Sequence, residues 1–317
     1  MRAVASAPGK IILFGEHAVV FGKPALAMAV NRRARVEIRK VSEDHISITI
    51  PDLDVEGVLQ PHGGLESSGT GKVGILRYIT EAIKLREVPG GLEVQVKLEI
   101  PIGAGMGSSA AITVATLAAL TQLQGQELDK KALARQAHQV ELRVQGAASP
   151  LDTAVSTHGG MVHLHPEGKV ENLEVPGQLP LVVAYTSYRG NTGELVAGVR
   201  QRREHYPEVV DPILDAMEMV THQARQALLD GEERALGDLM NINHGLLDAL
   251  GVNTPELSRM VYQARLAGAL GSKITGAGGG GSIIAYAPGR MEPVLEKLQQ
   301  EEEAFRVGLS HSGVEVE

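Results

Sequence analysis

The sequence predicts an α+β protein that is organised in two domains. Strand-like and helix-like segments alternate along the chain, but without the strict strand–helix–strand order of a doubly wound parallel sheet. The length of 317 residues corresponds to about two domains of ordinary size. Residues 166–180 are rich in Pro, Gly and charged side chains. We therefore expect a boundary here that separates residues 1–165 from residues 166–317.

Composition restricts the classes of function. Hydrophobic residues make up 43% of the chain but aromatic residues only 3%, so the cores must be aliphatic. The scarcity of aromatic side chains and the formal net charge of −8 disfavour binding to nucleic acids or to anionic membranes. One basic group, Arg32, Arg33 and Arg35, lies on a predicted strand, where we interpret it as a solvated strand edge.

The cellular compartment can be inferred from what the sequence lacks. There is no Cys, which excludes disulfides and thiolate metal sites and fits a reducing compartment. The apolar run at 11–14 does not form a signal peptide, and no stretch approaches the roughly 20 apolar residues of a membrane helix. We therefore expect a soluble, cytoplasmic protein.

Residues 1–100 predict mainly strands. Short apolar or alternating segments lie between Gly, Pro and charged residues at 4–7, 11–14, 34–38 and 46–50. A loop rich in Gly and Ser at 63–74 leads into a helix at about 73–85. The clearest strand is 92–100, where apolar and polar residues alternate without a miss, so one face is buried and the other is wet.

The remainder of the chain predicts more helix. A helix begins at Ser108 and is apolar nearly all round, which is typical of a buried helix. A second helix covers about 129–144 and ends at the Gly and Pro of 146–150. Further strands are expected at 161–165, 181–186, 282–286 and 305–309. Amphipathic helices are expected at 194–203, 209–229, 233–250, 255–270 and 291–303.

A glycine-rich loop between the strand at 92–100 and the helix at Ser108 carries most of the functional information. It reads Pro101-Ile102-Gly103-Ala104-Gly105-Met106-Gly107-Ser108-Ser109-Ala110-Ala111. Glycines at alternate positions let the backbone approach a phosphate, and the following helix directs free N–H groups and its positive dipole end at that anion. An ordinary Gly-rich turn capped by Ser is the alternative. The loop matches neither a Rossmann fingerprint nor a Walker A motif.

Two further segments give the loop a context. The first is Ala7-Pro8-Gly9-Lys10-Ile11-Ile12-Leu13-Phe14-Gly15-Glu16-His17-Ala18-Val19-Val20. The second is Lys273-Ile274-Thr275-Gly276-Ala277-Gly278-Gly279-Gly280-Gly281-Ser282. Together with the 101–111 loop, they resemble the three motifs of the GHMP kinase superfamily in the expected order.

Within this superfamily, the first of these segments resembles mevalonate kinases. Galactokinases typically read Gly-Glu-His-Thr-Asp-Tyr where this chain has Gly15-Glu16-His17-Ala18-Val19-Val20. Residues 145–157 depart from the His-Gly-x-Pro-Ser-Gly-x-Asp form of many mevalonate kinases and are similar to the shorter archaeal-type branch. The aspartate of that form, Asp152, is kept.

The resemblance implies a two-domain GHMP kinase fold with the active site in the interdomain cleft. It also implies ATP-dependent phosphorylation of mevalonate to 5-phosphomevalonate, with Mg²⁺ as cofactor, in a homodimer. By the same resemblance Asp152 is the catalytic base, paired with Lys10, and Ser109 and Glu141 are the Mg²⁺ ligands. The 101–111 loop binds ATP. The alcohol contacts Lys10 and Asp152 together with Glu16, His17 and Thr192.

Several of these residues also have a simpler interpretation. Glu141 could be an exposed helix carboxylate, Asp152 a helix N-cap after Pro150, Lys10 a surface lysine and His17 a packed histidine. The Gly276–Gly281 run could be only a tight turn, although the resemblance places it beside the phosphate loop.

Other functions also stay open. The rivals are a phosphomevalonate, homoserine or sugar kinase, and a non-catalytic ligand sensor on the same fold. Three further histidines, His158, His163 and His165, form no convincing metal set because no carboxylate or Cys completes it. We interpret these histidines as structural.

Overall fold

The computed structural model describes residues 1–317 apart from residues 62, 72, 102–103, 147 and 189. In the described part, the first sheet has the strand order β13-β1-β2-β6-β3-β4-β5, and β7 and β8 extend it beside β2. Its strands are β1 (Arg2–Phe14), β2 (Ala25–Val41), β3 (Ile46–Ile50), β4 (Val55–Leu59), β5 (Leu65–Gly69), β6 (Gly91–Leu98), β7 (Met161–Leu164), β8 (Val170–Leu173) and β13 (Glu315–Val316). The second sheet has the order β10-β11-β9-β12. Its strands are β9 (Leu181–Tyr185), β10 (Gly271–Thr275), β11 (Ser282–Tyr286) and β12 (Glu303–Val307).

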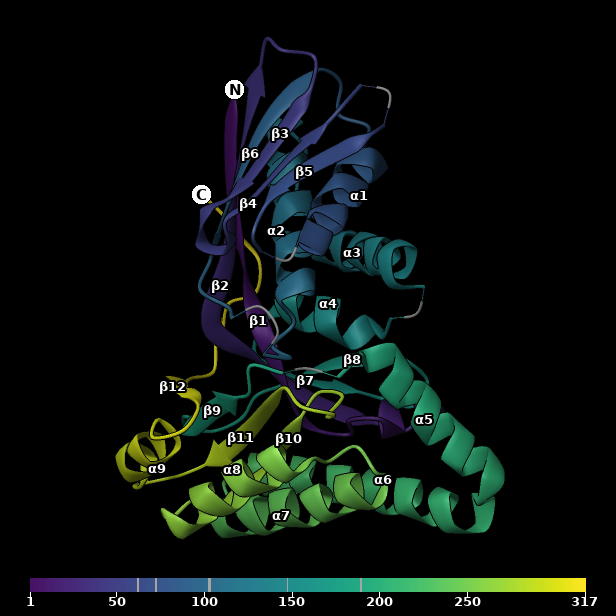
Figure 1. Cartoon of the computed structure of the whole chain (residues 1–317), viewed down its shortest axis with the longest axis vertical. Coiled ribbons are helices and arrows are strands. Elements are labelled where there is room, and N and C mark those ends of the chain that lie inside the picture. The colour runs from purple at the N-terminus through teal and green to yellow at the C-terminus, as the bar shows by residue number, and fades with distance from the viewer. Residues whose placement is uncertain (62, 72, 102–103, 147, 189) are drawn as a thin grey trace.

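The antiparallel pair β1 and β2 forms the spine of the molecule. These two long strands run from the upper sheet down to the second sheet (Figure 1). Their register runs from Arg2 opposite Arg39 to Phe14 opposite Leu26, with irregularities between Pro8 and Lys10 and between Ile12 and Phe14. The sequence predicted two short strands, 4–7 and 11–14, because Pro8 and Gly9 looked like a break. The strand accommodates them at an irregularity, where a missing ladder hydrogen bond is tolerated.

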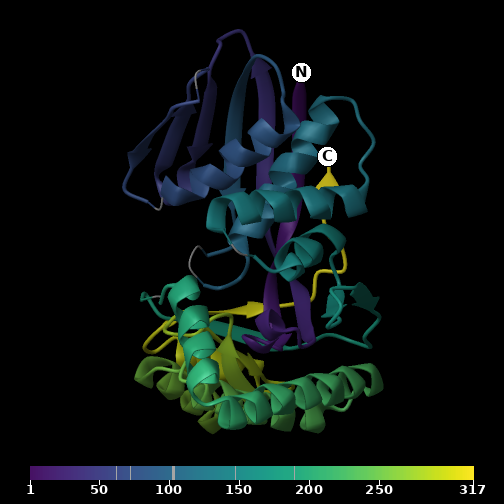
Figure 2. The same ribbon diagram turned by 90° about the vertical axis from the view of Figure 1, so that its right-hand side faces the viewer.

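Four helices cover one face of the upper sheet (Figure 2). They are α1 (Leu76–Arg86), α2 (Ser108–Leu123), α3 (Lys130–Gln145) and α4 (Pro150–His158). The central helix α2 packs on β1 and β2, and the other three pack against α2. Almost every residue of α2 is buried, as its all-round apolar sequence predicted.

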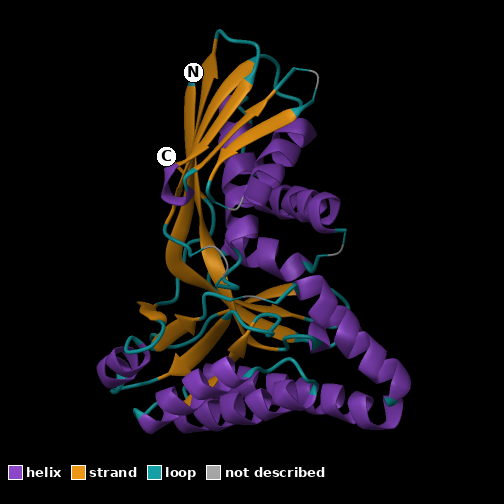
Figure 3. Ribbon diagram, in the orientation of Figure 1, coloured by secondary structure: helices purple, strands orange, loops and turns teal. Residues whose placement is uncertain are grey.

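The second sheet is packed with the remaining helices at the other end of the molecule (Figure 3). They are α5 (Thr192–His205), α6 (Pro207–Asp230), α7 (Glu233–Ala249), α8 (Pro255–Leu266) and α9 (Met291–Leu298). Alternation along β11 divides its side chains between two cores. Ile284 and Tyr286 belong to the large core shared with the upper sheet, and Ile283 and Ala285 to a second core with α8 and α9. None of the described helices is long and apolar enough to cross a membrane.

Several sequence expectations are wrong in detail. A strand, β5, occupies part of the loop expected at 63–74, and α4 forms where only a helix end was expected. Two of the last helices end earlier than expected, α8 at Leu266 and α9 at Leu298. The expected boundary segment contains β8, which pairs with β7, and the last strand, β13, returns to pair with β1. The division at 165/166 stays a prediction.

The basic group on β2 does not lie on a strand edge. Arg33 and Arg35 are on an interior strand, between β1 and β6. Their guanidinium groups instead fasten the C-terminal segment, since Arg33 pairs with Glu315 at 3.1 Å and Arg35 with Glu317 at 2.8 Å. The sequence could not show this because the paired residues lie about 280 positions apart.

Candidate active site

The N-terminal motif and the glycine-rich loop are joined backbone to backbone. The Lys10 N–H on β1 donates to the carbonyl oxygen of Met106 at 2.9 Å. The approach leaves no room for side chains, because a Cβ at Gly9 would lie 2.8 Å from Met106 O and one at Gly107 would lie 2.8 Å from Lys10 Cγ. Gly107 also has φ +66°, a conformation that favours glycine. Ile102 and Gly103, which we predicted to bind ATP, lie outside the described residues.

The start of α2 is well suited to an anion. The helix begins at Ser108, as the sequence predicted, and its N-cap is Gly107, which has no side chain to accept a hydrogen bond. The first N–H groups of a helix have no partner within it, and the helix dipole places partial positive charge there. The described part of the loop, 104–111, therefore directs donors and positive potential to the point where Lys10 approaches.

Lys10 and Asp152 form an ion pair at this point. Lys10 Nζ lies 3.2 Å from Asp152 Oδ2, and the lysine side chain is only 5% exposed whereas that of Asp152 is 29% exposed. Lys10 is thus no surface lysine. Nor is Asp152 a helix cap, because Ser149 caps α4 by accepting from the Leu151 N–H at 3.2 Å. Asp152 is left with its carboxylate facing the ammonium and partly open to solvent.

Glu141 on α3 and Ser109 on α2 form a second polar pair beside the first. The Ser109 hydroxyl donates to Glu141 Oε1 at 3.2 Å. Glu141 is 2% exposed, so the reading as an exposed helix carboxylate is wrong. Burial, and then the Asp152 carboxylate, raise the pKa of Glu141 to about 8, while the Ser109 hydrogen bond and the Lys10 charge act in the opposite direction. A buried carboxylate beside a second one and a hydroxyl is a donor set that suits a hard divalent cation.

Glu16 lies deeper than the sequence suggested. Its carboxylate forms a fully buried ion pair with Lys273 of β10 and accepts a hydrogen bond from Asn243 Nδ2 of α7 at 3.3 Å. Lys273 also donates to the carbonyl oxygen of Ile274 at 2.6 Å. These contacts occupy both carboxylate oxygens, and they tie the end of β1 to the second sheet.

His17 and the residues just before Thr192 both contact the C-terminal glycine-rich segment. His17 has φ +58°, and its Nε2–H donates to Ala277 O at 2.8 Å. Burial lowers the pKa of His17, so the ring is neutral at neutral pH. Thr192 is the first residue of α5, and the preceding Gly190 packs so closely on Gly279 that a Cβ at Gly190 would lie 2.8 Å from Gly279 O.

The C-terminal glycine-rich segment packs beside the glycine-rich loop that precedes α2. The Ser282 hydroxyl donates to Ala104 O at 2.6 Å, and the Thr275 hydroxyl donates to Ile12 O at 2.9 Å. A Cβ at Gly276 would lie 3.9 Å from Gly105 Cα, so the two backbones are close. Three sequence motifs that are far apart in the chain thus meet at one place.

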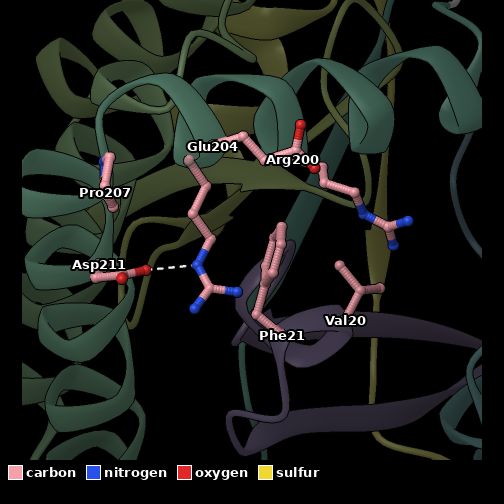
Figure 4. A pocket seen from close by; sticks show the side chains of 7 residues that line it. Val20, Phe21, Arg200, Glu204, Pro207 and Asp211 are labelled. Atoms are coloured by element: carbon pink, nitrogen blue, oxygen red, sulfur yellow. Dashed lines mark hydrogen bonds and ion pairs between the residues drawn. The ribbon is translucent and has the colours of Figure 1, made fainter.

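An open hollow of about 510 Å³ lies next to the N-terminal motif (Figure 4). It is bounded by the short 3₁₀ helix Ala18–Phe21 and by α5 and the start of α6. Its lining is Val20, Phe21, Arg200, Arg203, Glu204, Pro207 and Asp211. The lining does not include Lys10, Asp152 or Glu141. The hollow therefore does not contain the two polar pairs.

One prediction about the histidines is wrong. A carboxylate does join His163 and His165, namely that of Glu171 on the adjacent strand β8. We did not predict this pairing because β8 lies in the segment that we expected to be a domain boundary.

Sequence reasoning missed several side chains that shape the site. Lys273 and Asn243 hold Glu16, and Tyr78 of α1 lies beside Ser109 and Glu141, where burial and the Glu141 charge raise its pKa. Lys273 carried a signal in the sequence, because it is a charged residue within the motif that contains the glycine run.

Comparison with known proteins identifies the family. The model described as "GHMP kinases N terminal domain" matches residues 72–160, and that described as "GHMP kinases C terminal" matches residues 224–304. A mevalonate kinase of Methanothermobacter thermautotrophicus is 47% identical over 315 residues, which are 99% of this chain and 100% of the relative. A mevalonate kinase of Thermococcus gammatolerans is 49% identical over 312 residues, 94% of this chain and 93% of the relative.

Solved structures agree with the sequence comparison. The crystal structure of L. major mevalonate kinase in complex with R-mevalonate has a TM-score of 0.83 at 26% identity, over 97% of this chain and 96% of that chain. The chain therefore belongs to the GHMP kinases, and within that superfamily to the mevalonate kinase family. The resemblance inferred from the three motifs is confirmed, and so is the two-domain α+β fold.

Proposed function

We propose that this chain transfers the terminal phosphoryl group of ATP to the 5-hydroxyl of mevalonate, giving ADP and 5-phosphomevalonate. The single observation that carries the proposal is the ion pair between Lys10 Nζ and Asp152 Oδ2, 3.2 Å apart, beside the glycine-rich loop. Family membership supplies the reaction class. Phosphoryl transfer asks a protein mainly for positioning and charge neutralisation, and the groups around this pair are suited to both.

We propose that the 101–111 loop and the start of α2 bind the ATP phosphates. The described glycines leave space for a close backbone approach, and the first N–H groups of α2 have no acceptor within the helix. The C-terminal glycine-rich segment supports the loop from the other side through the Ser282 hydrogen bond.

Mg²⁺ is the cofactor that we propose for Ser109 and Glu141. The residues fit the ion because both offer hard oxygen ligands, 3.2 Å apart, and because burial and the Asp152 carboxylate keep the pKa of Glu141 raised even though Lys10 is near, so a divalent cation would favour its ionised form. When bound, Mg²⁺ supplies neutralisation of phosphate charge. Ser109 lies in the first turn of α2, and Glu141 lies on the adjacent helix α3.

In the proposed mechanism Asp152 accepts the proton of the mevalonate hydroxyl. Lys10, held by β1 and by contacts with the loop, orients the Asp152 carboxylate and donates a hydrogen bond to the same hydroxyl oxygen. Asp152 can reach a substrate because its side chain is 29% exposed, whereas the buried Lys10 is fixed in place. The pair thus aligns the nucleophilic oxygen with the phosphate loop.

The alcohol site is proposed to include Glu16, His17 and Thr192 beside Lys10 and Asp152. Because Lys273 and Asn243 occupy the Glu16 carboxylate, we assign Glu16 an indirect part, which is to fix the turn that carries His17. His17 is only 5% exposed, and its buried Nδ1 has no hydrogen-bond partner among the described residues, so we assign it to the wall of the alcohol site.

The test is a coupled ADP-release assay with mevalonate, phosphomevalonate, homoserine and galactose as substrates. We expect kcat/KM for mevalonate to exceed that of each other alcohol by at least about tenfold, equivalent to about 1.4 kcal/mol of discrimination. Equal turnover of another alcohol would refute the substrate. Absence of ADP release with all four would favour the non-catalytic sensor. The homodimer, the cytoplasmic location and the domain boundary at 165/166 are part of the same proposal.

A further inference from the structure

The hairpin of β7 and β8 brings two imidazoles and a carboxylate together. His163 and Glu171 are directly opposite each other across the antiparallel pair, and His165 follows two residues after His163, which places it on the same face. Glu171 Oε2 lies 3.5 Å from His163 Nδ1 and 2.9 Å from His165 Nε2. The two imidazole rings are 4.2 Å apart between centroids.

This cluster is separate from the proposed active site. Val162 and Leu164, which alternate with the histidines, pack in a small core with Leu151 and Val155 of α4, the helix that carries Asp152. The imidazoles therefore point to the opposite face of the hairpin. There they meet α6, whose Arg225 contacts Glu171.

We propose that His163, His165 and Glu171 bind a divalent transition-metal ion of the Zn²⁺ class. Two imidazoles and one carboxylate are a donor set that Zn²⁺ accepts, with metal–ligand bonds of about 2.0–2.2 Å, so tetrahedral ligand atoms lie roughly 3.3 Å apart. The observed separations of 2.9 and 3.5 Å bracket that value. All three ligand atoms lie within 4.8 Å of one another, so small side-chain rotations complete the set.

The surroundings of the cluster resemble the outer shell of a metal site. Arg225 Nη2 lies 3.3 Å from Glu171 Oε1, so it holds the second carboxylate oxygen and directs the first toward the imidazoles. A third imidazole, His222 of α6, lies 6.4 Å from His163 between ring centroids. The positive charge of Arg225 lowers the affinity relative to a site with no such neighbour.

His163 is the most buried member of the cluster. Its side chain is 3% exposed, and its Nδ1 faces Glu171 Oε2 at 3.5 Å, which is long for a hydrogen bond. A metal ion bound between Nδ1 and the carboxylate would replace this long contact with two coordinate bonds.

The experiment is a calorimetric titration of the full-length protein with Zn²⁺ alone. We expect one Zn²⁺ per chain at this cluster, and we expect His165→Ala and Glu171→Gln each to raise Kd about tenfold or more. These two positions are preferred to the more buried His163, because their side chains are 26% and 36% exposed, so the variants keep the fold. His205→Ala and Glu174→Gln, at exposed positions outside the cluster, are the matched controls and should bind as the wild type does.

A second readout identifies the ligands. Co²⁺ in place of Zn²⁺ should give visible absorption bands of a low-symmetry, nitrogen-bound ion in the wild type, and these bands should weaken in His165→Ala. Equal Zn²⁺ affinity in the wild type, His165→Ala and Glu171→Gln would overturn the proposal. It would also be overturned if Zn²⁺ binding vanished in Glu141→Gln and survived in His165→Ala, since the ion would then lie in the active site.

Discussion

Replacement of Glu141 by Gln is expected to stabilise the metal-free protein. Gln keeps the shape of the side chain and can still accept a hydrogen bond from Ser109, but it cannot ionise. In the wild type, burial and the Asp152 carboxylate raise the pKa of Glu141 to about 8. The folded protein therefore retains a proton that the unfolded chain releases near pH 4.5, and the stability of the wild type falls as the pH rises through this window.

The magnitude follows from the same pKa. The rise in the pKa of Glu141 from 4.5 to about 8 sets an upper limit of about 5 kcal/mol on the free energy of unfolding that its ionisation costs, at about 1.4 kcal/mol per pH unit. Relaxation of the site will reduce this cost to a few kcal/mol. The advantage of Glu141→Gln over the wild type should be small at pH 5, should grow up to pH 8 and should then level off. In the proposed function, the carboxylate that destabilises the metal-free wild type is also the group that binds Mg²⁺.

The assay compares urea unfolding midpoints by circular dichroism at pH 5, 6.5 and 8, in EDTA. Midpoints are compared between the two proteins at each pH because a two-domain chain need not unfold in a single step. Mg²⁺ with a non-hydrolysable ATP analogue should narrow the difference at pH 8, since it stabilises only the wild type through this carboxylate. A difference between the proteins that is independent of pH would refute the reasoning.

Three further predictions concern other contacts of the site. Asp152→Asn should lower kcat by about 10²–10⁴ with little change in KM for ATP, because it removes the proton acceptor; a kcat within about threefold of the wild type in the coupled assay would contradict this. Lys273→Met should cost about 3–5 kcal/mol in chemical unfolding, because it leaves the buried Glu16 carboxylate unpaired, and adding Glu16→Gln should recover most of the loss. Gly107→Ala should lower kcat at least about tenfold, because its Cβ would lie 2.8 Å from Lys10 Cγ at φ +66°; unchanged steady-state kinetics would show that the loop can yield there.

Ser149→Ala is the control for Asp152→Asn. It removes the N-cap of α4, which is expected to cost about 1 kcal/mol of stability, but leaves the carboxylate in place. A kcat loss as large as that of Asp152→Asn would mean that the position of α4, rather than the proton acceptor, limits the rate.

Local patterns in the sequence were sufficient for much of the fold. Strict alternation located the strand that became β6, and the all-round apolar sequence after Ser108 located α2 and its first residue. The two spine strands were harder to predict, because Pro8 and Gly9 read as breaks. The structure explains this glycine through a backbone approach to Met106, a long-range contact that no local pattern can report.

The site was predicted less evenly. The family resemblance identified Lys10, Ser109, Glu141 and Asp152, and the fold brings these four together. The partner of Glu16 could not be predicted, since Lys273 lies 257 positions away and nothing near either residue marks the other. The burial of Glu141 could not be predicted either, because a glutamate on a helix is usually exposed.

The pairing of β13 with β1 has a consequence for synthesis of the protein. Ala5 and Ser6 are opposite Val316 and Glu315, and the Glu317 N–H donates to Val4 O at 2.9 Å. On the ribosome, the strand made first must wait for residues made some 300 positions later before its outer edge at residues 4–6 is covered. Exposed strand edges invite pairing with other chains. We therefore expect nascent chains that lack residues 315–317 to aggregate more readily than chains that contain them, so that this short strand reduces misassembly during translation.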